Sequence, residues 1–257
     1  MAAKLARFAG SIQRLIRPFS SPGRVALYIL LSTPAAVAAG LAAGRLWLPL
    51  LQALAFYPLF CGLLLGGRMR RALWSALGWA FWMAVLVAGL SYALPEYCQQ
   101  RILNGEAYQA EMFDWIRTGS GAEGDIRLFL PQHLMHLAAF FLLTLLSAGF
   151  LSLALGSVLM NYMAFYVGTL LLQGTAGLPL LLIAWPPWAA LRVIAFILLA
   201  TGLSAWGLKR LKLGQAGRQQ VRPYLAAGLA LIGADILLKW LLAPYWREWL
   251  HGLTHWP

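Results

Sequence analysis

Two histidines three residues apart, His133 and His136, begin a helix-length apolar stretch that carries no charged residue. At this spacing the two side chains share one face of a helix. Imidazole can act as a general base or bind a metal near neutral pH, so both residues are candidate catalytic groups. The alternative is that they form only the polar rim of a membrane helix.

Three charged residues lie inside apolar runs: Arg192, Asp235 and Lys239. Charges within a membrane are costly and face the protein interior or a water-filled cavity, which makes each one a candidate for function. Helix geometry places Arg192 about 6 Å and Asp235 about 10 Å below the same boundary, so an ion pair is possible. Lys239 follows Asp235 by one helical turn and is an equally good partner. Asp235 is the third candidate catalytic residue, and a packing salt bridge is the alternative.

The sequence predicts no metal site and no cofactor. Metal sites usually need three or four ligands, and no HExxH or CxxC motif occurs in the chain.

The composition is that of a polytopic membrane protein, since 61% of the residues are hydrophobic and only 11% are charged. The net charge of +12 comes from basic residues beside long apolar runs. This position favours the anionic headgroups of membrane lipids as partners, and we expect no nucleic-acid partner.

Seven apolar windows are long enough to cross a bilayer, for which about 20 residues suffice. The fold class predicted is therefore an all-α transmembrane helix bundle. The windows are residues 25–44, 46–66, 72–94, 133–152, 153–172, 188–208 and 223–242.

Lysines and arginines cluster before the first span, between the second and third, and between the sixth and seventh. With seven spans all three clusters fall on one side, which the positive-inside rule makes cytoplasmic. We expect a bacterial-type inner membrane protein with a cytoplasmic N-terminus and an extracytoplasmic C-terminus.

Five segments follow from this topology. The first is a basic segment whose apolar residues recur at helical spacing, which predicts an amphipathic helix on the membrane surface. The alternative is that its basic residues serve only as a topology signal. Between and after the spans come one long outer loop with most of the acidic residues and an aromatic tail. The segments are residues 1–24 (basic), 25–94 (three spans), 95–131 (acidic loop), 132–243 (four spans) and 244–257 (tail).

The outer loop contains a short apolar stripe formed by Tyr108, Met112, Trp115 and Ile116. Two roles stay open for it, resting on the membrane surface or docking a partner.

Small residues in the fourth and fifth windows favour close helix packing. Gly149, Gly156 and Gly168 permit backbones to approach, and Asn161 can form a hydrogen bond across a helix interface. This pattern is typical of assembly, either with another membrane protein or with a second copy of the chain.

The order of features over residues 80–246 resembles the stage II sporulation protein M family of integral membrane proteins. The features are "LPEYC" at the end of a span, the outer segment "EMFDWIRTGSG", glycine-punctuated spans with Asn161 and Gly168, and "AWPPWAALRVIAFILLATGL". The resemblance implies a non-enzymatic inner-membrane component.

We therefore expect a membrane scaffold or a subunit of a membrane complex. Two alternatives stay open: a permease-type transport component that uses the intramembrane charges, and an outer-leaflet enzyme that uses His133 and His136.

Overall fold

The computed structural model describes residue 11 and residues 21–174, 177–214 and 217–254. The predicted all-α class is confirmed, since the regular structure of the described residues is helical apart from one isolated bridge between Gly174 and Thr254. The predicted amphipathic helix of residues 1–24 lies largely outside the described residues.

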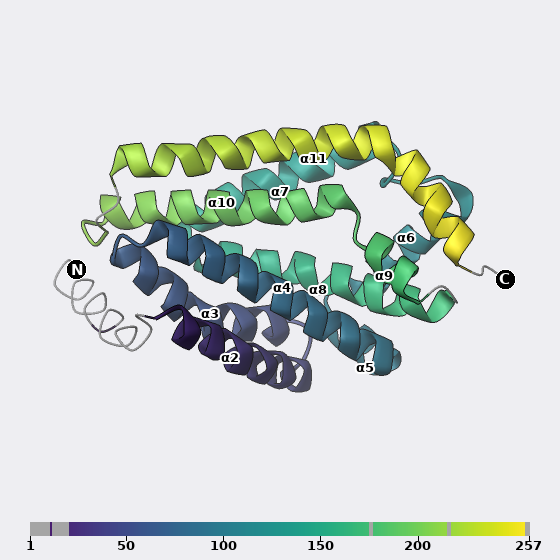
Figure 1. Cartoon of the computed structure of the whole chain (residues 1–257), viewed down its shortest axis with the longest axis horizontal. Helices are drawn as coiled ribbons and strands as arrows, with labels where there is room; N and C mark the ends of the chain where they lie inside the picture. Colours follow the sequence, from purple (N-terminus) through teal and green to yellow (C-terminus); the bar gives the residue numbers. More distant parts are fainter. Residues whose placement is uncertain (1–10, 12–20, 175–176, 215–216, 255–257) are drawn as a thin grey trace.

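Seven of the described helices are long and apolar enough to cross a membrane, which confirms the predicted number. The chain is a multi-pass integral membrane protein. The spans are α2 (Pro22–Ala43), α3 (Trp47–Leu65), α4 (Met69–Ala93), α7 (Ile126–Ser147), α8 (Phe150–Gln173), α10 (Pro187–Arg210) and α11 (Arg218–Leu253), shown in Figure 1.

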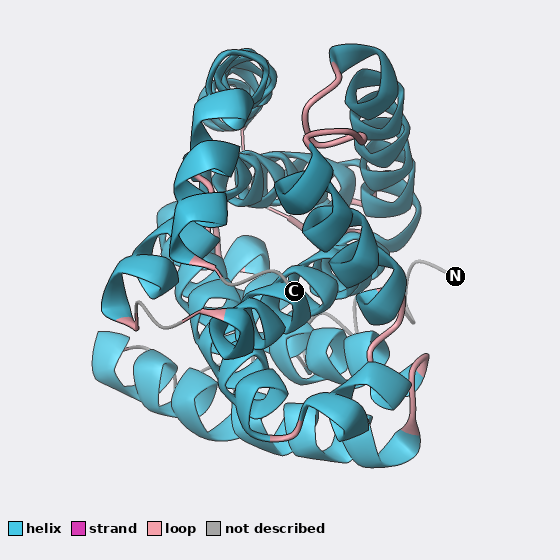
Figure 2. Ribbon diagram, turned by 90° about the vertical axis from the view of Figure 1, so that its right-hand side faces the viewer, coloured by secondary structure: helices cyan, strands magenta, loops and turns pink. Residues whose placement is uncertain are grey.

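The bundle has two ends of opposite charge. At the basic end α2, α4 and α11 begin and α10 finishes, beside Arg68, Arg70, Arg71, Lys209 and Arg210 (Figure 1, left). At the acidic end lie the shorter helices and the C-terminal part of α11 (Figure 1, right), and Figure 2 views the bundle from that end.

The boundary between the fourth and fifth spans differs from the predicted cut after residue 152. The turn lies at Ala148 and Gly149, whose φ angles are +50° and +101°. Both N–H groups bond to the Thr144 carbonyl, which ends α7. Gly149 adopts the left-handed conformation without a steric penalty, so the glycine decides where the chain turns.

The predicted acidic loop is largely helical and is shorter than expected, because α7 already begins at Ile126 and includes Pro131. It contains α5 (Pro95–Arg101) and α6 (Gly105–Thr118). The apolar stripe of α6 takes neither of the two roles considered for it. Met112, Trp115 and Ile116 are buried in the chain's own core, with Tyr108 packed beside them, where α6 meets α8 and α11.

The acidic end is closed by α9 (Leu178–Ala184) and by the end of α11. The predicted aromatic tail is a continuation of this last helix as far as Leu253. Trp246 donates its indole N–H to the Ile183 carbonyl at 2.8 Å, and Arg247 donates to the carbonyls of Trp115 and Arg117. The tail therefore fixes α9 and α6 in place.

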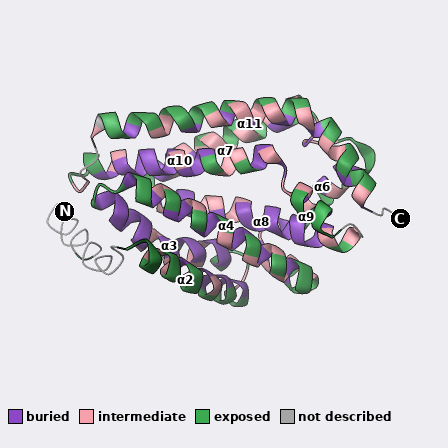
Figure 3. Cartoon of the chain, viewed as in Figure 1, coloured by how far each residue is buried: buried purple, intermediate pink, exposed green. Residues whose placement is uncertain are grey.

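The core is centred on α3, α8 and α10, while α7 and α11 keep much of their surface exposed (Figure 3). Because the exposed faces of the spans are also apolar, they suit contact with lipid chains. The buried polar residues are thus the exceptions that need an explanation.

Candidate functional site

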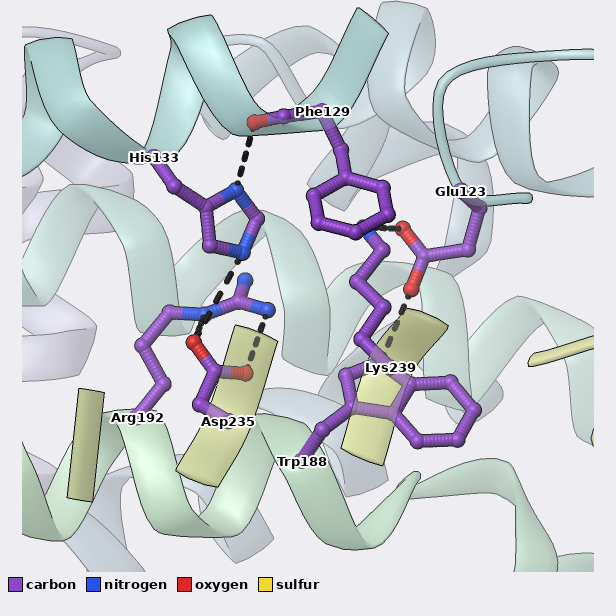
Figure 4. Close-up of polar contacts among 7 residues, drawn as sticks. All are labelled: Glu123, Phe129, His133, Trp188, Arg192, Asp235 and Lys239. Atoms are coloured by element: carbon purple, nitrogen blue, oxygen red, sulfur yellow. Dashed lines mark hydrogen bonds and ion pairs between the residues drawn. The ribbon is translucent and has the colours of Figure 1, made fainter. Parts of the chain in front are cut away.

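Two ion pairs lie inside the bundle toward the acidic end (Figure 4). The first joins Lys239 of α11 to Glu123, in the loop between α6 and α7, with Nζ 2.7 Å from Oε2. The other carboxylate oxygen of Glu123 accepts a hydrogen bond from the indole N–H of Trp188 at 3.0 Å. The Lys239 ammonium also lies 4.6 Å from the centre of the Phe129 ring, a cation–π contact.

The charge of Glu123 is maintained by these neighbours. Burial favours the neutral acid, while the positive charges of Lys239 and Arg192 favour the anion. The hydrogen bonds from Lys239 and Trp188 act in the same direction, so the pKa of Glu123 lies below its ordinary value. Glu123 is therefore an anion that the bundle stabilises.

The second pair joins Arg192 of α10 to Asp235 of α11. The guanidinium donates from Nε to Oδ2 at 2.9 Å and from Nη2 to Oδ1 at 3.0 Å, a two-point contact. The Asp235 side chain is fully buried, and the Arg192 side chain is 22% exposed. Such bidentate geometry fixes the relative positions of two helices as well as neutralising both charges.

His133 lies against this second pair. Its Nδ1 bonds to the Phe129 carbonyl at 2.9 Å, and since a carbonyl can only accept, Nδ1 carries the proton. Its Nε2 faces Oδ2 of Asp235 at 3.6 Å, too far for a hydrogen bond, and has no such partner among the described residues. The hydrogen bond at Nδ1 thus orients the imidazole ring, and Nε2 faces the Asp235 carboxylate without a hydrogen bond.

His136 lies outside this cluster, in the wall of a cavity. Four helices form a ring in which α4 and α7 each pack against α8 and α10. The ring surrounds a mainly apolar space of about 70 Å³, and His133, His136 and Arg192 are among the residues that line it. Gly156 of α8 lies in the same wall, and an added Cβ there would meet open space.

The other predicted packing residues do lie at close helix contacts. A Cβ on Gly168 would contact Ala88 O and lie 2.7 Å from Ser91 Cβ, so α8 and α4 approach closely there. A Cβ on Gly149 would collide with Ser204 of α10. Of the three glycines, only Gly156 does not lie at a close contact between helices.

Asn161 forms a reciprocal amide pair with Gln52 across the interface between α8 and α3. Asn161 Nδ2 donates to Gln52 Oε1 at 2.8 Å, and Gln52 Nε2 donates to Asn161 Oδ1 at 3.0 Å. Both side chains are buried, so each amide satisfies the other within an apolar interior.

The structure brings His133, Arg192, Asp235 and Lys239 into one region, and of the two pairings considered it forms the one between Arg192 and Asp235. Lys239 does not form an ion pair with Asp235; its partner is Glu123, which sequence analysis missed. One signal was available, because Glu123 stands in a glycine-flanked loop, "SGAEGD", that can turn inward. Gly124 permits this turn, since a Cβ there would lie 2.8 Å from the Trp115 indole nitrogen.

Within the described residues, no three His, Cys, Asp or Glu side chains lie close enough together to hold a metal ion. The chain matches no family model, no curated protein and no solved structure.

Proposed function

We propose that this membrane protein is a non-enzymatic scaffold or subunit of a complex in a bacterial-type inner membrane. The proposal rests on one observation, which is that the charged residues within the spans pair with one another or with a loop residue. Arg192, Asp235 and Lys239 all enter ion pairs that tie α10, α11 and the loop before α7 together. Such pairs position helices, and they leave no charged path across the bundle.

We assign the exposed face of α6, at the acidic end, to the partner. The helices of this end are held by buried contacts, and α6 exposes Glu106, Glu111 and Asp114. A fixed helix with an acidic outer face suits a partner with a basic surface, because complementary charge steers association. The resemblance to the stage II sporulation protein M family implies the same functional class.

The test is purification of the tagged chain from its native membranes in mild detergent. We expect a second protein, or a second copy of the chain, at near-equal amount. The variant Glu106→Gln/Asp114→Asn should lose it, because both side chains lie on the exposed face of α6. The matched control Glu96→Gln/Glu248→Gln removes two exposed charges from α5 and α11 and should retain it. Recovery of the wild-type chain as a lone monomer would contradict the proposal.

A second candidate is an enzyme that uses His133 as a general base. The observation that favours it is the Nε2 atom, which has no hydrogen-bond partner among the described residues and faces Asp235 at 3.6 Å. In a deletion strain, His133→Gln and His136→Ala separate the two candidates. Full complementation by both variants favours the scaffold, while loss of complementation by an abundant, folded variant favours the enzyme.

A further inference from the structure

A broad cationic pocket lies at the basic end, far from the ion pairs described above. It has a volume of about 780 Å³ and lies between the beginnings of α4 and α11. Three arginines from α4 and the turn before it face two polar residues of α11, with a tryptophan at the side. These residues are Arg68, Arg70, Arg71, Trp74, Gln220 and Tyr224.

No Asp or Glu side chain is among the described residues that line this pocket. Of the chain's eight acidic residues, seven lie in α5, α6, the loop before α7 or the end of α11, all at the acidic end. The eighth, Asp235, lies about 16 Å along α11 from Tyr224 and bonds to Arg192. The charge of Arg68 and Arg70 is therefore not balanced by an acid of the same chain, and the pocket fits an anion.

The backbone at the start of α4 also favours a bound anion. α4 begins at Met69, and the residue before it, Arg68, makes no side-chain capping bond. The first N–H groups of a helix lack intrahelical acceptors and carry partial positive charge, which favours a bound phosphate.

An apolar groove adjoins the cationic pocket and shares Arg71 and Trp74 with it. The groove has a volume of about 570 Å³ and lies between α2 and α4, along Val25, Ile29 and Phe81. From Arg71 to Phe81 it extends about 15 Å along α4. That is about half of the 30 Å hydrocarbon core, or the depth of one leaflet.

We infer that this end of the chain is a binding site for an anionic phospholipid. The headgroup phosphate contacts Arg68, Arg70 and Arg71, and one acyl chain lies in the groove between α2 and α4. Trp74, which is 62% exposed and lines both cavities, lies at the level where headgroup meets chain, a position that tryptophan favours. The site is at the opposite end from the proposed partner surface and does not depend on it.

The first test is native mass spectrometry of the purified full chain in detergent. The chain is titrated with phosphatidylglycerol and with phosphatidylcholine that carries the same acyl chains. We expect saturable binding of one phosphatidylglycerol and weaker binding of phosphatidylcholine. Equal affinity for the two lipids would overturn the inference. The arginines would then serve only to set the orientation of the chain in the membrane.

Paired variants then locate the site. Arg68→Gln/Arg70→Gln should weaken phosphatidylglycerol binding about 30-fold, since each interfacial arginine contributes roughly five-fold. The control Lys209→Gln/Arg222→Gln removes the same charge from exposed residues at the same end that do not line the pocket. Equal losses in both variants would show nonspecific attraction and contradict a built site.

A matched pair of glycine variants tests the apolar groove. Gly78 lines the groove and Gly89 lies further along the same helix, and a Cβ at either position would meet open space. Gly78→Leu should displace the acyl chain and weaken binding, whereas Gly89→Leu should leave it unchanged. If millimolar inorganic phosphate displaces the lipid and Gly78→Leu has no effect, the ligand is a soluble phosphate and the lipid assignment is wrong.

Discussion

Lys239 and Glu123 form a buried ion pair with 2.7 Å between Nζ and Oε2, although they stand 116 residues apart in the chain. The pair joins the last span to the loop that leads into α7. It ties the acidic end to a membrane helix, and the first prediction concerns its removal.

Lys239→Met should destabilise the protein by about 3–5 kcal/mol, because it leaves the Glu123 carboxylate buried without its cation. The double variant Glu123→Gln/Lys239→Met should recover much of this loss, since no charge then stays buried. Unfolding in detergent, followed by tryptophan fluorescence, measures both. Arg117→Gln is the control, because its pair with Asp114 is exposed and should contribute less than about 1 kcal/mol. A double variant no more stable than Lys239→Met would contradict this account.

The same carboxylate predicts a pH dependence. The pKa of Glu123 is lower in the folded chain than its ordinary value of 4.5, so folding favours the ionised form. Its contribution to stability is present above pH 4.5 and is lost as the pH falls through the folded pKa. The difference in melting temperature between wild type and Glu123→Gln should therefore be large at pH 7 and shrink below pH 4. A difference that stays constant across this range would refute the assignment.

Two glycines of α8 should respond in opposite ways to the same substitution. Gly168→Ala should destabilise the protein by about 2 kcal/mol or more, because its Cβ would collide with the backbone of α4. Gly156→Ala places its Cβ in open space and should be neutral or stabilising by up to about 1 kcal/mol, from helix propensity. Thermal unfolding of the two variants side by side is the measurement. Equal destabilisation would mean that both glycines contact another helix.

The amide pair between Asn161 and Gln52 should behave as a unit. Asn161→Leu leaves the Gln52 amide buried without its partner and should cost about 1–3 kcal/mol. Gln52→Leu/Asn161→Leu should cost less than either single variant, because no unsatisfied amide is left. A double-mutant cycle in detergent checks the coupling, and strictly additive losses would show that the two hydrogen bonds are independent of one another.

The helices could be predicted from the sequence because each span is a local property. A run of about 20 apolar residues has to form internal hydrogen bonds in lipid, whatever surrounds it, so the seven spans follow from composition alone. The boundary between α7 and α8 was misplaced, because the apolar run continues through the turn. The positive φ angles of Ala148 and Gly149 mark the turn, and a backbone angle is not visible as a change in hydropathy.

The site could be predicted only in part, since its contacts depend on which helices are neighbours. Arg192, Asp235 and Lys239 were found because a charge within an apolar run is conspicuous in sequence. Glu123 was missed, because it stands among other acids of a polar loop and only the fold turns it inward. In the same way, Gly156 and Gly168 belong to one sequence pattern, yet α4 lies against Gly168 alone.

The last helix has a consequence for the membrane itself. Pro223 and Pro244 both lie inside α11, about 32 Å apart along its axis, close to the 30 Å thickness of a hydrocarbon core. α11 bends toward its C-terminal end (Figure 1). Pro244 lies inside this helix and has no N–H to donate, and Trp246 and Arg247 beyond it bond to α9 and α6. The helix segment between the two prolines thus matches the thickness of the hydrocarbon core, and we expect the folded chain to be most stable in a bilayer of about that thickness.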